Sequence, residues 1–296
     1  MLAAAAGQLA AASVLAPVPG WNSGLATAPP LEPARELRRR LWQALNGVPV
    51  RIPWYDGIRL ELIPGNDVSR CLYIGGAIDP NEFAFLAERL EPGMTVIDAG
   101  ANEGLYSLFM SRRVGPKGKV LAIEPSARER VRLERNLALN RISNVLVVPA
   151  ALGECDGRGV LRIAEAAHAG HNTLGRPAAP WVKVESEIQV PLSPLDRIAA
   201  SEGLGRIHLI KLDVEGAELA ALRGAEEVLR RDRPVLLLEF MPEALATQGA
   251  SAPALLEFLR ERGYAFFDFS PASGKPVPLK GDHPSAVNII AEPRAA

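Results

Sequence analysis

From residue 91 onward, short apolar runs alternate with longer stretches in which apolar residues recur at helical spacing. Such runs are typical of strands buried on both faces, and their alternation with amphipathic helices is typical of βαβ units in a mostly parallel sheet. The last two runs are separated by a Pro- and Gly-rich loop without a helix, which predicts an antiparallel pair at the sheet edge. The predicted strands of the sheet are 95–98, 119–124, 145–150, 207–212, 234–240, 264–269 and 286–291. Helices are predicted over 102–113 and 217–231. A β excursion over 159–163 and 182–190 surrounds a polar loop, 168–174, which is a candidate cover for the substrate.

The pattern before residue 91 is different. Apolar residues at helical spacing in 31–45 predict a helix, and alternation in 48–63 around Asp56-Gly57 predicts a β-hairpin. A second amphipathic helix is expected over 82–90, with Pro80 in its first turn and Asp79 as its cap. We therefore predict three parts: a flexible tail or linker over 1–30, a small helix and hairpin subdomain over 31–90, and an α/β domain over 91–296.

The first predicted strand of the sheet ends in a glycine-containing turn, Asp98-x-Gly100-x-x-x-Gly104. Glycines allow a sharp strand-to-helix turn in which the backbone can approach a ligand. A dinucleotide-binding fingerprint would require glycine where the chain has Asn102 and Leu105. S-adenosylmethionine carries no phosphate, and a carboxylate suits its ammonium and sulfonium groups. The turn therefore favours S-adenosylmethionine over NAD, while an ordinary structural turn remains the alternative.

Acidic residues also end the later strands. Glu124, at the end of the second strand, is placed to accept hydrogen bonds from both hydroxyls of an adenosine ribose. The small apolar run 149–153 would suit the surface beside an adenine ring, although taken alone it is better explained as a close-packed turn. Asp213, Glu215 and Glu218 follow the fourth strand, where helix capping could explain the two glutamates but explains Asp213 less well.

Composition excludes several classes of protein. The chain of 296 residues has a net charge of −1 and 48% hydrophobic residues, which does not indicate electrostatic binding of nucleic acid. Two distant cysteines and four histidines form no zinc or disulfide pattern. The apolar first sixteen residues lack a basic region and are too short to span a bilayer. We expect a cytoplasmic protein without stable membrane insertion, and its oligomeric state stays open.

Five segments together resemble the FkbM family of S-adenosylmethionine-dependent methyltransferases. They are 98–106, Glu124-Pro125-Ser126, 136–140, Gly170-His171-Asn172-Thr173 and Lys211-Leu212-Asp213-Val214-Glu215-Gly216-Ala217-Glu218. The resemblance covers roughly residues 70–293. One departure concerns residues 73–80: the family often has an aromatic residue and a glutamate before the proline, where this chain has Ile78 and Asp79. Because this segment is expected to border the acceptor pocket, the departure leaves the acceptor open.

The resemblance implies a class I methyltransferase (Rossmann-like) fold, with a seven-stranded, mostly parallel sheet and a reversed last strand. It implies S-adenosylmethionine as the cofactor and O-methylation of a hydroxyl on a sugar, glycan or polyketide-type metabolite. The resemblance and the positions at the ends of the predicted strands together give the expected cofactor-binding residues. They are Asp98, Gly100, Asn102, Gly104, Tyr106, Glu124, Pro125, Ala151 and Asp213.

Methyl transfer from a sulfonium needs alignment of donor and acceptor and a base only for the acceptor hydroxyl. Candidates for the base are, in order, Asp213, His171 and Glu239. No metal is predicted, although Asp213 and Glu239 could instead bind Mg²⁺. Two other functions stay open: an NAD-dependent oxidoreductase and a catalytically inactive binding protein with this fold.

Overall fold

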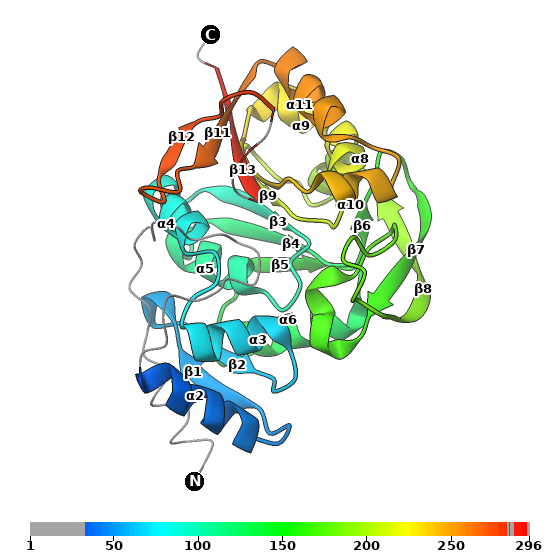
Figure 1. The fold of residues 1–296 in the computed structure, drawn as a ribbon. Coiled ribbons are helices and arrows are strands. Elements are labelled where there is room, and N and C mark those ends of the chain that lie inside the picture. The colour runs from blue at the N-terminus through cyan, green and yellow to red at the C-terminus, as the bar shows by residue number, and fades with distance from the viewer. Residues whose placement is uncertain (1–32, 283, 285–286, 295–296) are drawn as a thin grey trace.

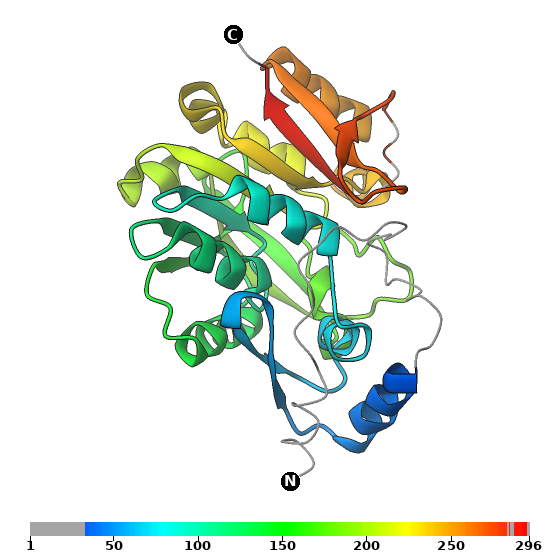
Figure 2. The same cartoon turned by 90° about the vertical axis from the view of Figure 1, so that its left-hand side faces the viewer.

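The computed structural model describes residues 33–282, 284 and 287–294. Its centre is an eight-stranded sheet in the order β12-β11-β13-β10-β9-β3-β4-β5, flanked by helices on both faces (Figures 1 and 2). The bounds of these strands are β3 Thr95–Ala99, β4 Lys119–Ile123, β5 Val145–Val148, β9 Ile207–Leu212, β10 Val235–Glu239, β11 Tyr264–Phe269, β12 Pro276–Pro278 and β13 Asn288–Pro293. The α/β fold with a mostly parallel sheet is confirmed.

The last strand is reversed, as predicted, but it does not lie at the edge. β13 runs antiparallel to β10 on one side and to β11 on the other. The last two predicted strands, β11 and β13, do pair antiparallel, but the long loop after β11 places β13 inside the sheet, next to β10. Their predicted position at the edge is therefore wrong. The edge is formed by β12, which sequence analysis missed. Its prolines, Pro276 and Pro278, lack a backbone N–H group and are tolerated at an edge.

The two faces of the sheet bury separate cores. Along β3, Val96 belongs to one core and Ile97 to the other, because successive side chains of a strand point to opposite faces. The first core contains side chains from α4 (Pro80–Arg89), α5 (Leu105–Val114) and α6 (Ala127–Leu139). The second contains side chains from α7 (Leu195–Ser201), α8 (Glu218–Arg223), α9 (Glu226–Asp232), α10 (Pro242–Thr247) and α11 (Ala252–Glu261).

The segments before residue 91 pack onto the first core. Helix α2 (Pro33–Ala44) and the hairpin of β1 (Val50–Pro53) and β2 (Arg59–Leu62) form as predicted, with a short 3₁₀ turn, η1 (Tyr55–Gly57), between the strands. The side-chain oxygen of Asn140 accepts a hydrogen bond of 2.8 Å from the backbone N–H of Arg59. That of Asn136 accepts one of 3.1 Å from Glu61. These bonds attach the hairpin to α6.

Two predicted helices needed correction. The expected helix over 217–231 is divided at Gly224, where a Cβ atom would lie 2.1 Å from the carbonyl oxygen of Gly153. Helix α5 begins at Leu105 rather than at Asn102, because Gly104 takes a left-handed conformation with φ of 91°. Helix α10 and the short α3 (Asp67–Arg70) were not predicted, and a single-turn π-helix, η2 (Cys71–Gly75), follows α3.

A second, three-stranded sheet lies after β5 and confirms the predicted β excursion. Its order is β6-β8-β7, formed by Ala151–Leu152, Val184–Ser193 and Gly157–Ala164 respectively. The loop between β7 and β8 contains η3 (Ala166–His171), and Thr173 forms an isolated bridge to Arg162 on β7. The loop that carries the predicted base His171 is thus attached to a strand.

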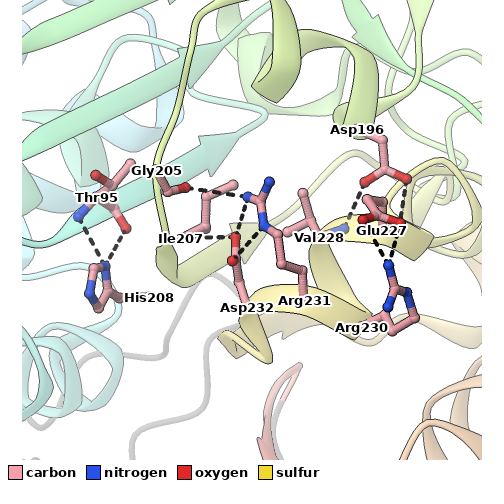
Figure 3. A network of polar contacts seen from close by, with 10 residues as sticks. All are labelled: Thr95, Asp196, Gly205, Ile207, His208, Glu227, Val228, Arg230, Arg231 and Asp232. Carbon is pink, nitrogen blue, oxygen red and sulfur yellow. Dashed lines mark hydrogen bonds and ion pairs between the residues drawn. The ribbon is translucent and has the colours of Figure 1, made fainter.

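A polar network fixes the end of β9 that is remote from the acidic strand ends (Figure 3). The side chain of Asp232 accepts a hydrogen bond of 3.0 Å from the backbone N–H of Ile207, and His208 contacts the backbone of Thr95. Asp196, from α7, accepts hydrogen bonds from the backbone of α9 at Glu227 and Val228. The network therefore holds β9 against β3 and α9 against α7. Among the helices that the structure describes, none is long and apolar enough to cross a membrane.

Candidate active site

A cavity of about 980 Å³ lies over the carboxyl ends of the central parallel strands. Its floor includes Gly100 after β3, Glu124 after β4, Asp213 after β9 and Glu239 at the end of β10. Two segments contribute much of its wall, residues 66–79 and the excursion around η3. The carboxyl ends of strands in an open α/β sheet are the usual ligand-binding edge.

Most of the predicted site residues line this cavity. Those that do so are Gly100, Asn102, Tyr106, Glu124, Pro125, Ala151, Asp213, His171 and Glu239. Gly104 is absent from the lining, as is Asp98, whose side chain is fully buried. The two segments expected to border the acceptor also contribute, through residues 74–79 except Gly76 and through residues 168–174 except Thr173. Tyr73 does not; it is buried and its ring lies 5.1 Å from that of Trp42.

Lys211 lies at the centre of the cavity floor. Its ammonium lies 3.0 Å from Oδ2 of Asp213 and 3.8 Å from Oδ1 of Asp98, and it donates a hydrogen bond of 3.3 Å to the carbonyl of Gly100. Burial opposes the charged form of Lys211, but the two aspartates outweigh it and raise the pKa above its ordinary value. Asp98 thus acts beneath the cavity: it fixes Lys211 and accepts a hydrogen bond from Ser107.

Glu124 is fixed by the backbone. Its carboxylate accepts hydrogen bonds from the N–H groups of Asn102, at 2.9 Å, and Ser126, at 2.8 Å. Burial raises its pKa to about 7 even though these bonds favour the charged form. Each carboxylate oxygen keeps a free lone pair, and the buried Oδ1 of Asn102 has no hydrogen-bond partner among the described residues. Both side chains can therefore still bind a polar ligand.

Asp79 occupies the cap position of α4, but its side chain makes no cap bond. Instead its Oδ2 accepts a hydrogen bond of 2.9 Å from the hydroxyl of Tyr106, across the cavity wall. Burial raises the pKa of Asp79 to about 6. The expected capping role was wrong because the residue adopts a left-handed conformation, with φ of 45°, that turns the carboxylate away from the helix.

Glu82, one turn further along α4, is buried, and its Oε1 accepts a hydrogen bond of 2.9 Å from the side-chain N–H of Asn288 on β13. Burial raises the pKa of Glu82 from 4.5 to about 8. The folded protein then binds a proton that the unfolded chain releases, so the free energy of unfolding falls as the pH rises from 4.5 toward 8.

Substituting Glu82→Gln should remove this pH dependence. We expect the variant to match the native protein near pH 5 and to exceed its unfolding free energy by roughly 1–3 kcal/mol near pH 9, because the amide keeps the bond to Asn288 without a buried charge. Urea unfolding at both pH values measures the difference. Glu88→Gln, on the exposed side of the same helix, is the control. Equal behaviour of the two variants at the higher pH would contradict the prediction.

The remaining acids form a group beside the η3 loop. Nδ1 of His171 lies 3.2 Å from Oε1 of Glu215, and this contact raises the pKa of His171. Glu215 has a left-handed backbone, with φ of 52°, and its carbonyl accepts hydrogen bonds from Thr173 and Gln248. Burial, followed by the charges of neighbouring acids, raises the pKa of Glu239 well above its ordinary value.

Sequence reasoning did not assign site roles to Lys211, Asp79 or Glu215. Lys211 and Asp213 share a strand face, which is the signal that could have identified Lys211. The role of Asp79 had no usable signal, because an aspartate before a proline at a helix start is more often a cap. Trp181, at the cavity wall and 61% exposed, was also missed because its loop has no periodic pattern.

The strand order, the reversed strand β13 and the acid-lined cavity at the carboxyl edge define the class I methyltransferase architecture. Comparison with known sequences agrees with this. The model of the methyltransferase FkbM domain matches residues 98–266, more than half of the chain. The chain belongs to the FkbM methyltransferase family. The methyltransferase class is confirmed with it, and so is S-adenosylmethionine as the cofactor, since that family uses this methyl donor.

Three curated proteins are similar to parts of the chain. Methyltransferase sdnD of Sordaria araneosa is 34% identical over 157 residues, which cover 45% of this chain and 60% of that protein. Methyltransferase 1 of Beauveria bassiana is 31% identical over 147 residues, covering 45% and 58%. The 2-O-methyltransferase NoeI of Sinorhizobium fredii is 25% identical over 182 residues, covering 57% and 72%. The chain thus spans about three fifths of the first two relatives.

Proposed function

We propose that this protein transfers a methyl group from S-adenosylmethionine to a hydroxyl of a sugar, glycan or polyketide-type metabolite. The observation that carries the proposal is the cavity itself. It has a fixed carboxylate, Glu124, at one end, and a histidine held by a glutamate, together with two further acids, at the other. The name of one relative, a 2-O-methyltransferase, supports an oxygen acceptor.

The donor is proposed to bind at the β3 and β4 ends. Glu124 would bind the ribose hydroxyls, and the small apolar residues Ala150 and Ala151 would lie beside the adenine. Asn102 would offer its unpaired side-chain oxygen to the donor. The cofactor supplies an electrophilic methyl group, and the protein supplies alignment and a cavity that excludes water. In this arrangement Gly104 and Asp98 support the turn from beneath, without touching the ligand.

Among the three candidate bases, the contacts favour His171. Asp213 is already paired with Lys211, whose ammonium lies 3.0 Å from its Oδ2. Glu239 lies deeper, with 8% of its surface exposed. The carboxylate of Glu215 accepts from Nδ1 of His171 and so leaves the other ring nitrogen as the proton acceptor. The acceptor hydroxyl would lose its proton to His171 as its oxygen forms the bond to the methyl carbon, while the bond from that carbon to the sulfonium sulfur breaks and S-adenosylhomocysteine leaves.

Calorimetric titration tests the donor site. We expect the protein to bind S-adenosylmethionine and S-adenosylhomocysteine but not NAD, and Glu124→Ala to weaken binding at least about tenfold, as loss of charged hydrogen bonds does. Glu134→Ala, on the exposed face of α6, should bind as the native protein does. Binding of NAD alone would favour an oxidoreductase. Binding of none of the three would favour a non-catalytic protein.

A further inference from the structure

Three carboxylates from two neighbouring strands converge in the cavity. Asp213 and Glu215 follow β9, and Glu239 ends β10, which lies beside β9 in parallel register. One oxygen from each of the three side chains lies within 4.8 Å of the others. Parallel strands bring their carboxyl ends to the same edge, so this convergence follows from the fold. Three carboxylates at this separation cannot all be ionised without repelling one another unless a cation lies between them.

The positively charged side chains nearby neutralise these three carboxylates only in part. Lys211 pairs with Asp213 but is shared with Asp98 on the far side. His171 contacts Oε1 of Glu215 and leaves the second oxygen of that carboxylate available. Glu218, the next acid along, is occupied by the backbone N–H groups of Val214 and Gly216. These bonds attach its side chain to the loop, and it lies outside the group of three.

Glu239 gives an independent indication of a ligand. Its side chain is more than nine-tenths buried, and its Oε2 has no hydrogen-bond partner among the residues that the structure describes. It nevertheless lines the cavity and belongs to the group of three. An unpaired carboxylate oxygen in a buried position costs free energy, which a bound ligand would recover.

We propose that Asp213, Glu215 and Glu239 bind a divalent cation of the Mg²⁺ or Mn²⁺ type. Carboxylate oxygens are the ligands that these hard cations prefer, and Mg²⁺ is commonly bound through few carboxylates, with water and substrate oxygens filling the other positions. The next step rests on the proposed function: the acceptor hydroxyl occupies one of the remaining coordination positions of the cation. A cation held there would polarise the O–H bond: the proton would pass to His171 as the oxygen bonds to the methyl carbon, while the S–CH₃ bond breaks and S-adenosylhomocysteine leaves.

Binding of Mn²⁺ to the full-length protein, followed by electron paramagnetic resonance after dialysis against EDTA, tests this site. In the absence of any methyl donor, we expect one saturable site with a dissociation constant below about 1 mM. Glu239→Gln, which keeps the size of the side chain, should weaken binding at least about tenfold. Glu243→Gln is the matched control: it also lines the cavity but is exposed and outside the group.

Each result has a distinct meaning. No saturable Mn²⁺ binding by the native protein, or equal binding by Glu239→Gln and Glu243→Gln, overturns the cation site. Should Glu239→Gln fail to fold, Glu215→Gln replaces it in the same comparison. If S-adenosylhomocysteine binds while Mn²⁺ does not, the cation site falls and the proposed function stands. If Mn²⁺ binds and neither methyl cofactor does, the proposed function falls and the cation site stands.

Discussion

Gly100→Ala is expected to cost more than about 3 kcal/mol of unfolding free energy, a large part of the stability of an ordinary domain. A Cβ atom at this position would lie 1.8 Å from the backbone carbonyl oxygen of Asp213, and the backbone φ of 75° is itself unfavourable for alanine. Because the clash is with backbone, no side-chain rotation relieves it. The ends of β3 and β9 would have to separate, which would also displace Lys211.

Gly249→Ala separates the cost of the clash from the cost of the left-handed backbone conformation. Gly249 has the same φ of 75°, but no atom lies within 4 Å of the position of its Cβ. This variant should therefore show only the cost of the left-handed conformation, about 1–2 kcal/mol. Urea unfolding followed by circular dichroism compares the two. Similar losses would mean that the close approach at Gly100 is unimportant.

Lys211→Met should be the second most damaging change. It would leave Asp98 fully buried without the cation that now lies 3.8 Å away, and removal of one partner from a buried ion pair typically costs about 3–5 kcal/mol. Thermal unfolding should show a corresponding fall in the melting temperature. Lys119→Met, at the exposed start of β4, is the control and should change stability little.

A second substitution tests the cause. If the loss arises from an uncompensated charge at Asp98, the double variant Lys211→Met, Asp98→Asn should be more stable than Lys211→Met alone, since the amide can still accept from Ser107. If instead the double variant is the less stable of the two, the role of Lys211 is one of packing, for example against the ring of Tyr106 at 4.8 Å.

The sheet was predictable because its strands are apolar on both faces and so carry a strong local signal. The predicted bounds of β9 agree with the structure, and β11 agrees as well. The position of β13 was not predictable, because pairing between distant strands leaves no periodic pattern in either. Helix α10 was missed because it has only six residues, fewer than two turns.

For the candidate site too, local features were predictable from the sequence and long-range contacts were not. Residues at strand ends, such as Glu124 and Asp213, were predicted because the fold brings all carboxyl ends of the parallel strands to one edge. The glycines were predicted correctly as turn residues, but the close contact of Gly100 is with Asp213, and a Cβ on Gly104 would lie 2.3 Å from Leu133. A sequence cannot distinguish close approach to a ligand from close approach to another part of the chain.

The reversed strand β13 also constrains how the protein acquires its fold during synthesis. Residues 288–293 fill the gap between β10 and β11, yet they emerge from the ribosome after both. Until then β10 and β11 each have one edge without a strand partner, and the part of the sheet beyond β10 cannot be completed. Final folding therefore waits for β13 to leave the ribosome, and a ribosome stalled in the loop before β13 would display one open edge of β10 and one of β11 to chaperones.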